Sequence, residues 1–150
     1  MPQSLAQVHI HVIFSKNRTL FLVDTGLRKR MHAYLASIIK VHDSPARIVG
    51  GTADHVHILL ALSRTNPISK VIGEVKRNSS KWIKTNGSDF ELFQWQSGYG
   101  AFSVSFSRID EVQKYIAEQM EHHKKMSFQE EYRNFFRKHN VNFDENYVWD

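Results

Sequence analysis

The sequence contains no cysteine, few prolines and no long apolar run. Without cysteine among its 150 residues, the chain forms neither a disulfide nor a thiolate zinc site. No stretch approaches the roughly 18 consecutive apolar residues of a membrane-spanning helix. The first residues lack the basic and apolar regions of a signal peptide, and no internal repeat or linker interrupts the chain. We therefore expect a single cytoplasmic domain over residues 1–150.

The charge balance is basic, with a formal net charge of +5 and a sequence pI near 9.5. Such a bias favours attraction to phosphate backbones, although many basic proteins bind no nucleic acid. Hydrophobic residues make up 41% of the chain and charged residues 23%, as in an ordinary globular domain. Charge alone therefore leaves the partner open.

Hydrophobic periodicity predicts the order strand, helix, strand, strand, helix, strand, helix, helix. Strands are expected over residues 8–14, 46–49, 55–62 and 101–106. Two helices are expected to begin at an N-cap at Asp24 and at Asn66-Pro67. A third should follow Ser107 and carry both Tyr115 and Gln119, and a fourth should run from Ser127 to about His139. An unbroken βαββαβ core predicts an α+β, ferredoxin-like (RRM-like) antiparallel sheet with helices on one face, plus C-terminal helices. The other face of the sheet would then be free to hold a site.

Two histidines flank one residue at the start of the third predicted strand, in His55-Val56-His57. Side chains at i and i+2 of a strand share a face, so both imidazoles can face one cation. The pattern also occurs in His9-Ile10-His11, and either pair could consist of half-buried histidines without a metal. The turn at residues 51–54 favours the second pair. His9 and His11 would then support that site or be solvated.

Tyr115 and Gln119 lie four positions apart in a helical segment and therefore share a face. A tyrosine hydroxyl beside a metal-held phosphodiester can take the phosphate in a covalent transfer. Aromatic residues on amphipathic helices are more often core residues, so the spacing alone does not decide between a catalytic and a packing role.

A basic stripe follows the helix that begins near Asn66-Pro67. It is either a solvated face or a surface that binds phosphates. With two further arginines, the candidate DNA-binding residues are Arg47, Arg64, Lys70, Arg77, Lys81 and Lys84. Trp95 and Tyr99 could stack on unpaired bases or be buried.

Four segments, taken in order, resemble the single-tyrosine HUH transposases of insertion sequences that move as single-stranded DNA. The segments at residues 54–59 and 115–119 are similar to the two signatures of the family, those with the histidine pair and the tyrosine. Residues 95–104 are similar to its tryptophan- and glycine-containing segment, and residues 121–132 to its tail. The resemblance runs over residues 5–140 and implies that the chain is one HUH transposase domain.

The resemblance implies a role for each matched residue. His55, His57 and Gln119 would be metal ligands, and Tyr115 would be the nucleophile. It also implies a divalent cation (Mg²⁺ or Mn²⁺), a homodimer, and cleavage and rejoining of single-stranded DNA with hairpins through a 5′-phosphotyrosine. Two imidazoles suit Mn²⁺ better than Mg²⁺, which prefers oxygen ligands.

Three other functions remain open at this stage. The chain could be a domesticated REP-associated relative that acts on repeated hairpins, a non-catalytic nucleic-acid-binding module, or a histidine-rich nucleotide hydrolase. An RNA-binding module would need exposed aromatic residues on its sheet, where these strands carry histidines instead. The sequence also leaves open the DNA target, the metal, and whether Tyr115 meets the histidines of its own chain or of a partner.

Overall fold

The computed structural model describes residues 2–16 and 24–150 of the chain. Its strands are β1 (His9–Ser15), β2 (Ala46–Gly51), β3 (His55–Ala61) and β4 (Gly100–Val104). Its helices are α1 (Thr25–Val41), α2 (Ile68–Lys84), α3 (Ile109–Ala117), α4 (Gln119–His122) and α5 (Phe128–Lys138), with 3-10 turns at Ser88–Phe90 and Phe106–Arg108. None of the helices in these two ranges has the length and apolar character needed to cross a bilayer.

The strands form one antiparallel sheet in the order β2-β3-β1-β4. This is the strand order of the ferredoxin-like fold, and the predicted fold class is confirmed. In the register of β1 and β3, Ile13 lies opposite His57 and Ser15 lies opposite His55. Because directly paired residues share a face, the two histidines lie on the same face as Ile13 and His11.

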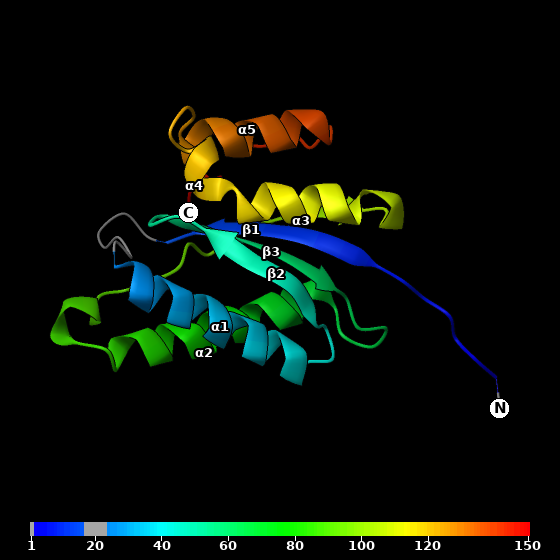
Figure 1. The fold of residues 1–150 in the computed structure, drawn as a ribbon, viewed down its shortest axis with the longest axis horizontal. Helices are drawn as coiled ribbons and strands as arrows, with labels where there is room; N and C mark the ends of the chain where they lie inside the picture. The colour runs from blue at the N-terminus through cyan, green and yellow to red at the C-terminus, as the bar shows by residue number, and fades with distance from the viewer. Residues whose placement is uncertain (1, 17–23) are drawn as a thin grey trace.

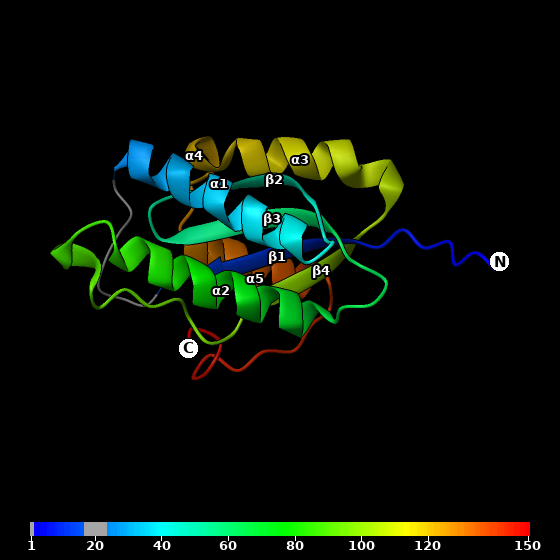
Figure 2. The same ribbon diagram turned by 90° about the horizontal axis from the view of Figure 1, so that it is seen from below.

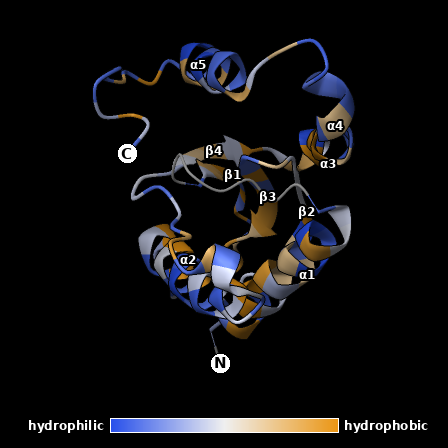
Figure 3. Ribbon diagram, turned by 90° about the vertical axis from the view of Figure 1, so that its left-hand side faces the viewer, coloured by the Kyte–Doolittle hydropathy of each residue, from blue (hydrophilic) through white to orange (hydrophobic). Residues whose placement is uncertain are grey.

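Helices cover both faces of this sheet. On one face, α1 and α2 pack against a core that includes Val12, Phe14, Ile58 and Leu60 (Figures 1 and 2). On the other face, α3, α4 and α5 lie over the histidines (Figure 3). The expectation that this second face would be free is therefore wrong, because the C-terminal helices fold back over it.

The predicted helix starts differ in their outcome. The Asp24 side chain accepts the backbone N–H of Leu27 at 3.1 Å, and Ser127 accepts that of Glu130 at 3.2 Å, as capping predicts. Asn66 is no cap: its Nδ2 donates to the carbonyl of His42 at 3.0 Å, and α2 begins at Ile68. Ser107 lies inside a 3-10 turn, so the helix after it begins at Ile109.

The helix that carries Tyr115 ends before Gln119. The structure places Tyr115 on α3 and Gln119 on α4, with Glu118 between the two helices. The N–H of Glu118 bonds to the carbonyls of Lys114 at 3.1 Å and Tyr115 at 3.3 Å, which closes the last turn of α3. The prediction of one continuous helix is wrong, yet both side chains still point to the same place.

The close approach of α3 to β2 depends on a glycine. A Cβ atom at Gly50 would lie 2.8 Å from the carbonyl oxygen of Ile116, next to Tyr115. We expect Gly50→Ala to push α3 from the sheet and to cost about 1–3 kcal/mol of unfolding free energy, as overpacking typically does.

Gly73→Ala is the matched control, because a Cβ there, inside α2, has no atom within 4 Å. It should stabilise by up to about 1 kcal/mol through helix propensity. Urea unfolding of the two variants measures both effects, and a Gly50→Ala protein as stable as the parent would contradict the close approach.

Candidate active site

His55 and His57 are held on β3 with their Nδ1 atoms already engaged. His55 Nδ1 lies 2.7 Å from Asp54 Oδ1, and His57 Nδ1 lies 2.7 Å from His11 Nε2. Partners of this kind fix the orientation of a ring and the tautomer of a metal-binding histidine. Both Nε2 atoms are thus directed to one place between the sheet and α5. His11 therefore supports the site, one of the two alternatives that the sequence left open.

The carboxylate of Glu131 on α5 lies at the centre of this group and is 2% exposed. Its Oε1 lies 2.9 Å from His57 Nε2, 3.5 Å from His55 Nε2 and 3.2 Å from His123 Nε2. Its Oε2 accepts hydrogen bonds from the Tyr115 hydroxyl and, at 3.1 Å, from Gln119 Nε2. Glu131 thus contacts every residue predicted for the site.

Glu131 and His123 belong to this group but were not predicted from the sequence as site residues. A signal for Glu131 was present, because it lies three positions after Phe128 and one before Tyr132, on the buried stripe of α5. A carboxylate on an apolar stripe is unusual unless it has partners. His123 gave no such signal, since it lies in a polar segment after α4.

Gln119 reaches the histidines through its amide oxygen. Gln119 Oε1 lies 2.9 Å from His55 Nε2 and 3.0 Å from His123 Nε2, and the side chain is buried. Its amide nitrogen donates to Glu131, as given above. The structure therefore brings together the three predicted ligands, His55, His57 and Gln119, and adds Glu131 to them.

Tyr115 is half-buried at the edge of this group. Its ring stacks on His122 at 4.5 Å between centroids and meets Phe135 edge-on at 5.7 Å. Burial, and then the negative charge of Glu131, raise the pKa of the hydroxyl well above its usual value. At neutral pH the hydroxyl is therefore protonated and acts as a donor to Glu131.

The ionisation of the central groups suits a cation. Burial lowers the pKa of His57 to about 4, so this imidazole is neutral near pH 7. Burial opposes ionisation of Glu131, but hydrogen bonds from His123 and His57 outweigh it and hold its pKa below the usual range. An ionised carboxylate therefore faces a neutral imidazole, which could bind a cation through Nε2 once the ring proton lies on Nδ1, opposite His11 Nε2.

The donor atoms fit a divalent cation. Among the described residues, His55, His57 and Glu131 offer ligand atoms that all lie within 4.8 Å of one another. Two ligands at right angles, each about 2.1 Å from one ion, are about 3 Å apart, close to the separations given above. If the Nδ1–H of His55 donates a hydrogen bond to Asp54, the Nε2 atom of the neutral ring carries a lone pair and faces Gln119 Oε1, which is also an acceptor. A cation bound to both atoms would remove this repulsion between two acceptors.

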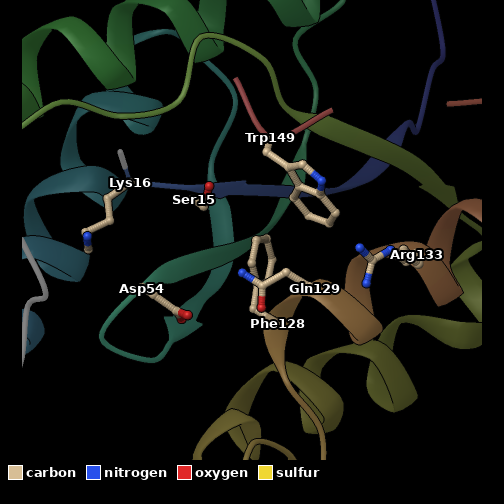
Figure 4. Close-up of a pocket in the computed structure, with 7 residues that line it drawn as sticks. All are labelled: Ser15, Lys16, Asp54, Phe128, Gln129, Arg133 and Trp149. Carbon is tan, nitrogen blue, oxygen red and sulfur yellow. The ribbon is translucent and has the colours of Figure 1, made fainter. Parts of the chain in front are cut away.

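A pocket of about 360 Å³ lies between the end of β1, the residue before β3 and the start of α5 (Figure 4). Asp54, which bonds to His55, and Phe128, which stacks on His55 at 4.4 Å, both line this pocket. Arg133 and Trp149 form another part of its wall, with the guanidinium over the indole ring. The pocket therefore leaves space for part of a ligand beside two residues that contact His55.

Four of the six predicted DNA-binding residues lie on the opposite side of the sheet from this site. Lys70, Arg77, Lys81 and Lys84 are exposed on α2, across the sheet from Tyr115 (Figure 1). Arg47 is exposed on β2, and Arg64 donates to the carbonyl of Ser4 at 2.9 Å.

The two candidate stacking residues differ in their exposure. Trp95 is buried and donates to Ser79 Oγ at 2.9 Å, so it packs in the core and offers no stacking surface. Tyr99 is half-buried beside Lys76, whose ammonium group lies 5.6 Å from the centre of its ring.

Residues 4–119 match the family described as "Transposase IS200 like". The chain belongs to the IS200-like transposase family. The matched region contains His55, His57, Tyr115 and Gln119 and ends before Glu131. A search of curated proteins found no match to this IS200-like transposase.

Two solved structures share the fold of this IS200-like transposase. One is described as a transposase from Deinococcus radiodurans R1, with a TM-score of 0.61 at 16% identity over 79% of this chain and 98% of that one. The other is a REP-associated tyrosine transposase bound to a REP hairpin, with a TM-score of 0.61 at 10% identity over 82% of this chain and 73% of that one. At these identities the likeness establishes the fold alone.

Proposed function

We propose that this IS200-like transposase cleaves and rejoins single-stranded DNA at hairpin-flanked element ends, with Tyr115 as the nucleophile. The observation that carries the proposal is the contact of the Tyr115 hydroxyl with Glu131, which also contacts the two histidines. Nucleophile and candidate metal ligands thus meet within one chain. Tyr115 and His123 are the half-buried members of the group, so a phosphate would approach along this edge.

His55, His57 and Gln119, together with Glu131, would hold the divalent cation (Mg²⁺ or Mn²⁺) that the family resemblance implies. When bound, such a cation polarises a phosphate and offsets its developing negative charge. Glu131 Oε2 accepts the hydrogen bond from the Tyr115 hydroxyl and would receive its proton as the tyrosine oxygen attacks. Attack on phosphorus then breaks the bond to the 3′-oxygen, which leaves a 5′-phosphotyrosine and a 3′-hydroxyl. Another 3′-hydroxyl can reverse the reaction and rejoin the strand.

The test of this function is a covalent adduct on a denaturing gel. The wild-type chain is incubated with Mn²⁺ and a single-stranded oligonucleotide that contains a hairpin. The adduct should carry the strand on the 3′ side of the cut, because tyrosine retains the 5′-phosphate. Cleavage without an adduct would indicate a metal-dependent hydrolase. No cleavage of any hairpin tested would favour a non-catalytic binding module.

A domesticated role remains the second candidate, favoured by the fold shared with the REP-associated transposase. The chemistry would be the same, and the DNA flanking the gene separates the two. The RNA-binding module is less favoured, because α3, α4 and α5 cover the sheet face that would stack bases.

The basic stripe on α2 is proposed to bind the hairpin, on the opposite side of the sheet from the chemistry. The double substitution Lys81→Ala with Lys84→Ala should weaken hairpin binding. It should also reduce, by about two, the slope with which the logarithm of the binding constant falls with the logarithm of salt concentration, since each phosphate contact contributes about 0.9. A matched pair on α1, Lys29→Ala with Lys40→Ala, removes the same charge from exposed sites. Equal losses in both pairs, measured by fluorescence anisotropy, would show that only net charge matters.

A homodimer is proposed because a single tyrosine allows one covalent link to DNA per active site. A mobile element has two ends, so its movement requires two active sites. The contact of Tyr115 with His57 and Glu131 within one chain supports a complete site in each protomer of this dimer. A mixture of Tyr115→Phe and His57→Ala chains should therefore stay inactive after verified subunit exchange. Recovery of adduct formation on mixing would instead show that the sites are shared.

A further inference from the structure

We propose that Glu131 couples the nucleophile to the metal site, with Oε1 as a protein ligand of the cation and Oε2 as the acceptor that orients the Tyr115 hydroxyl. This proposal rests on the proposed function and assigns a role to a residue outside the matched family region. One side chain would thereby set the position of Tyr115 relative to the cation.

The two oxygens of Glu131 have different neighbours. In the part of the chain that the structure describes, the polar contacts of Oε1 are with imidazole nitrogens, at 2.9 Å from His57, 3.2 Å from His123 and 3.5 Å from His55. Oε2 accepts from the Tyr115 hydroxyl and from the Gln119 amide. One oxygen of this carboxylate thus lies among imidazole nitrogens that can bind a metal, and the other accepts from the proposed nucleophile. The same side chain can therefore bind the cation and orient the Tyr115 hydroxyl.

The charge of Glu131 also calls for a cation. The carboxylate is 2% exposed, and the ion-pair partners found for it in the described residues are histidines, without a lysine or arginine. A buried carboxylate is costly unless its charge is compensated. A divalent cation beside Oε1 would supply that compensation.

The packing of α5 fixes the position of this carboxylate. Phe128, Tyr132 and Phe136 pack with Ile13 and Phe102 of the sheet. Phe128 also stacks on His55, so the helix that carries Glu131 is anchored on a candidate metal ligand. Glu131 is thus held by a packed helix, as a positioned ligand requires.

The first test measures binding of Mn²⁺ alone to the full chain by calorimetry, without DNA. Glu131→Gln keeps the size and polarity of the side chain but loses its charge, and should weaken Mn²⁺ binding at least about tenfold. Glu130→Gln, one residue away and exposed, is the matched control and should leave the affinity unchanged. Equal Mn²⁺ affinity of the wild type and Glu131→Gln would overturn the ligand role.

The second test measures the rate of adduct formation at saturating Mn²⁺. Glu131→Gln should stay at least about a hundredfold slower than wild type with unchanged hairpin affinity, since excess metal does not restore the contact to Tyr115. Glu131→Asp keeps the negative charge on a shorter side chain. Compared with Glu131→Gln, it should recover more of the Mn²⁺ affinity than of the rate of adduct formation. Full recovery of Glu131→Gln at high Mn²⁺ would overturn the orienting role. If the wild-type protein binds Mn²⁺ but forms no adduct, both the proposed function and the orienting role of Glu131 are refuted. The ligand role of Glu131 is still decided by the first test.

Discussion

Tyr115→Phe is expected to abolish the covalent protein–DNA adduct while hairpin affinity stays within about twofold of wild type. The substitution removes only the hydroxyl, and the ring keeps its stacking on His122 and its contact with Phe135. Without that oxygen no phosphotyrosine forms, so the loss should be complete. Adduct formation is measured on denaturing gels, and hairpin binding by anisotropy.

Tyr132→Phe and Tyr99→Phe are the controls for this substitution. Tyr132 is buried on α5, and Tyr99 is half-buried near Lys76. Both variants should still form the adduct. An adduct that persists in Tyr115→Phe and disappears in one of these two would move the nucleophile to that residue.

His57→Ala is expected to remove metal-dependent cleavage. His57 is fully buried, and its Nε2 lies 2.9 Å from Glu131 at the centre of the site. Its loss removes one proposed metal ligand and leaves the Glu131 carboxylate without its nearest imidazole. Titration of Mn²⁺ into chelator-treated protein should restore the wild type but not the variant, and circular dichroism checks that the variant is folded.

The other histidine pair provides a graded comparison. His11 touches His57 Nδ1, so His11→Ala should weaken Mn²⁺ binding by about 10–100-fold, as loss of a supporting partner typically does. His9 lies at the start of β1, and His9→Ala should have a smaller effect still. Equal losses from His9→Ala and His57→Ala would show that the first histidine pair also serves the site.

Local patterns in the sequence predicted those parts of the site that depend on one element. The i, i+2 spacing on β3 placed His55 and His57 on one face, and the strand order followed from the order of the elements. The continuous helix was wrongly predicted, yet Tyr115 and Gln119 lie together, since both side chains bond to Glu131 Oε2.

Contacts between distant elements could not be predicted in this way. Glu131 meets His57 across 74 positions of sequence, and it does so only because α5 folds back over the sheet. No period in the sequence encodes that docking, which depends on the fit of Phe128 and Tyr132 against the covered face. The same docking closed the face that was expected to be free.

The most direct test of Tyr115 as the nucleophile is mass spectrometry of the trapped adduct. After nuclease and trypsin digestion, which cuts after Lys114 and Lys124, the peptide over residues 115–124 contains Tyr115 as its only tyrosine. We expect a 5′-phosphonucleotide on Tyr115 in this peptide, present with Mn²⁺ and absent with a chelator. A nucleotide on another residue, or DNA cleavage with no modified peptide, would contradict it.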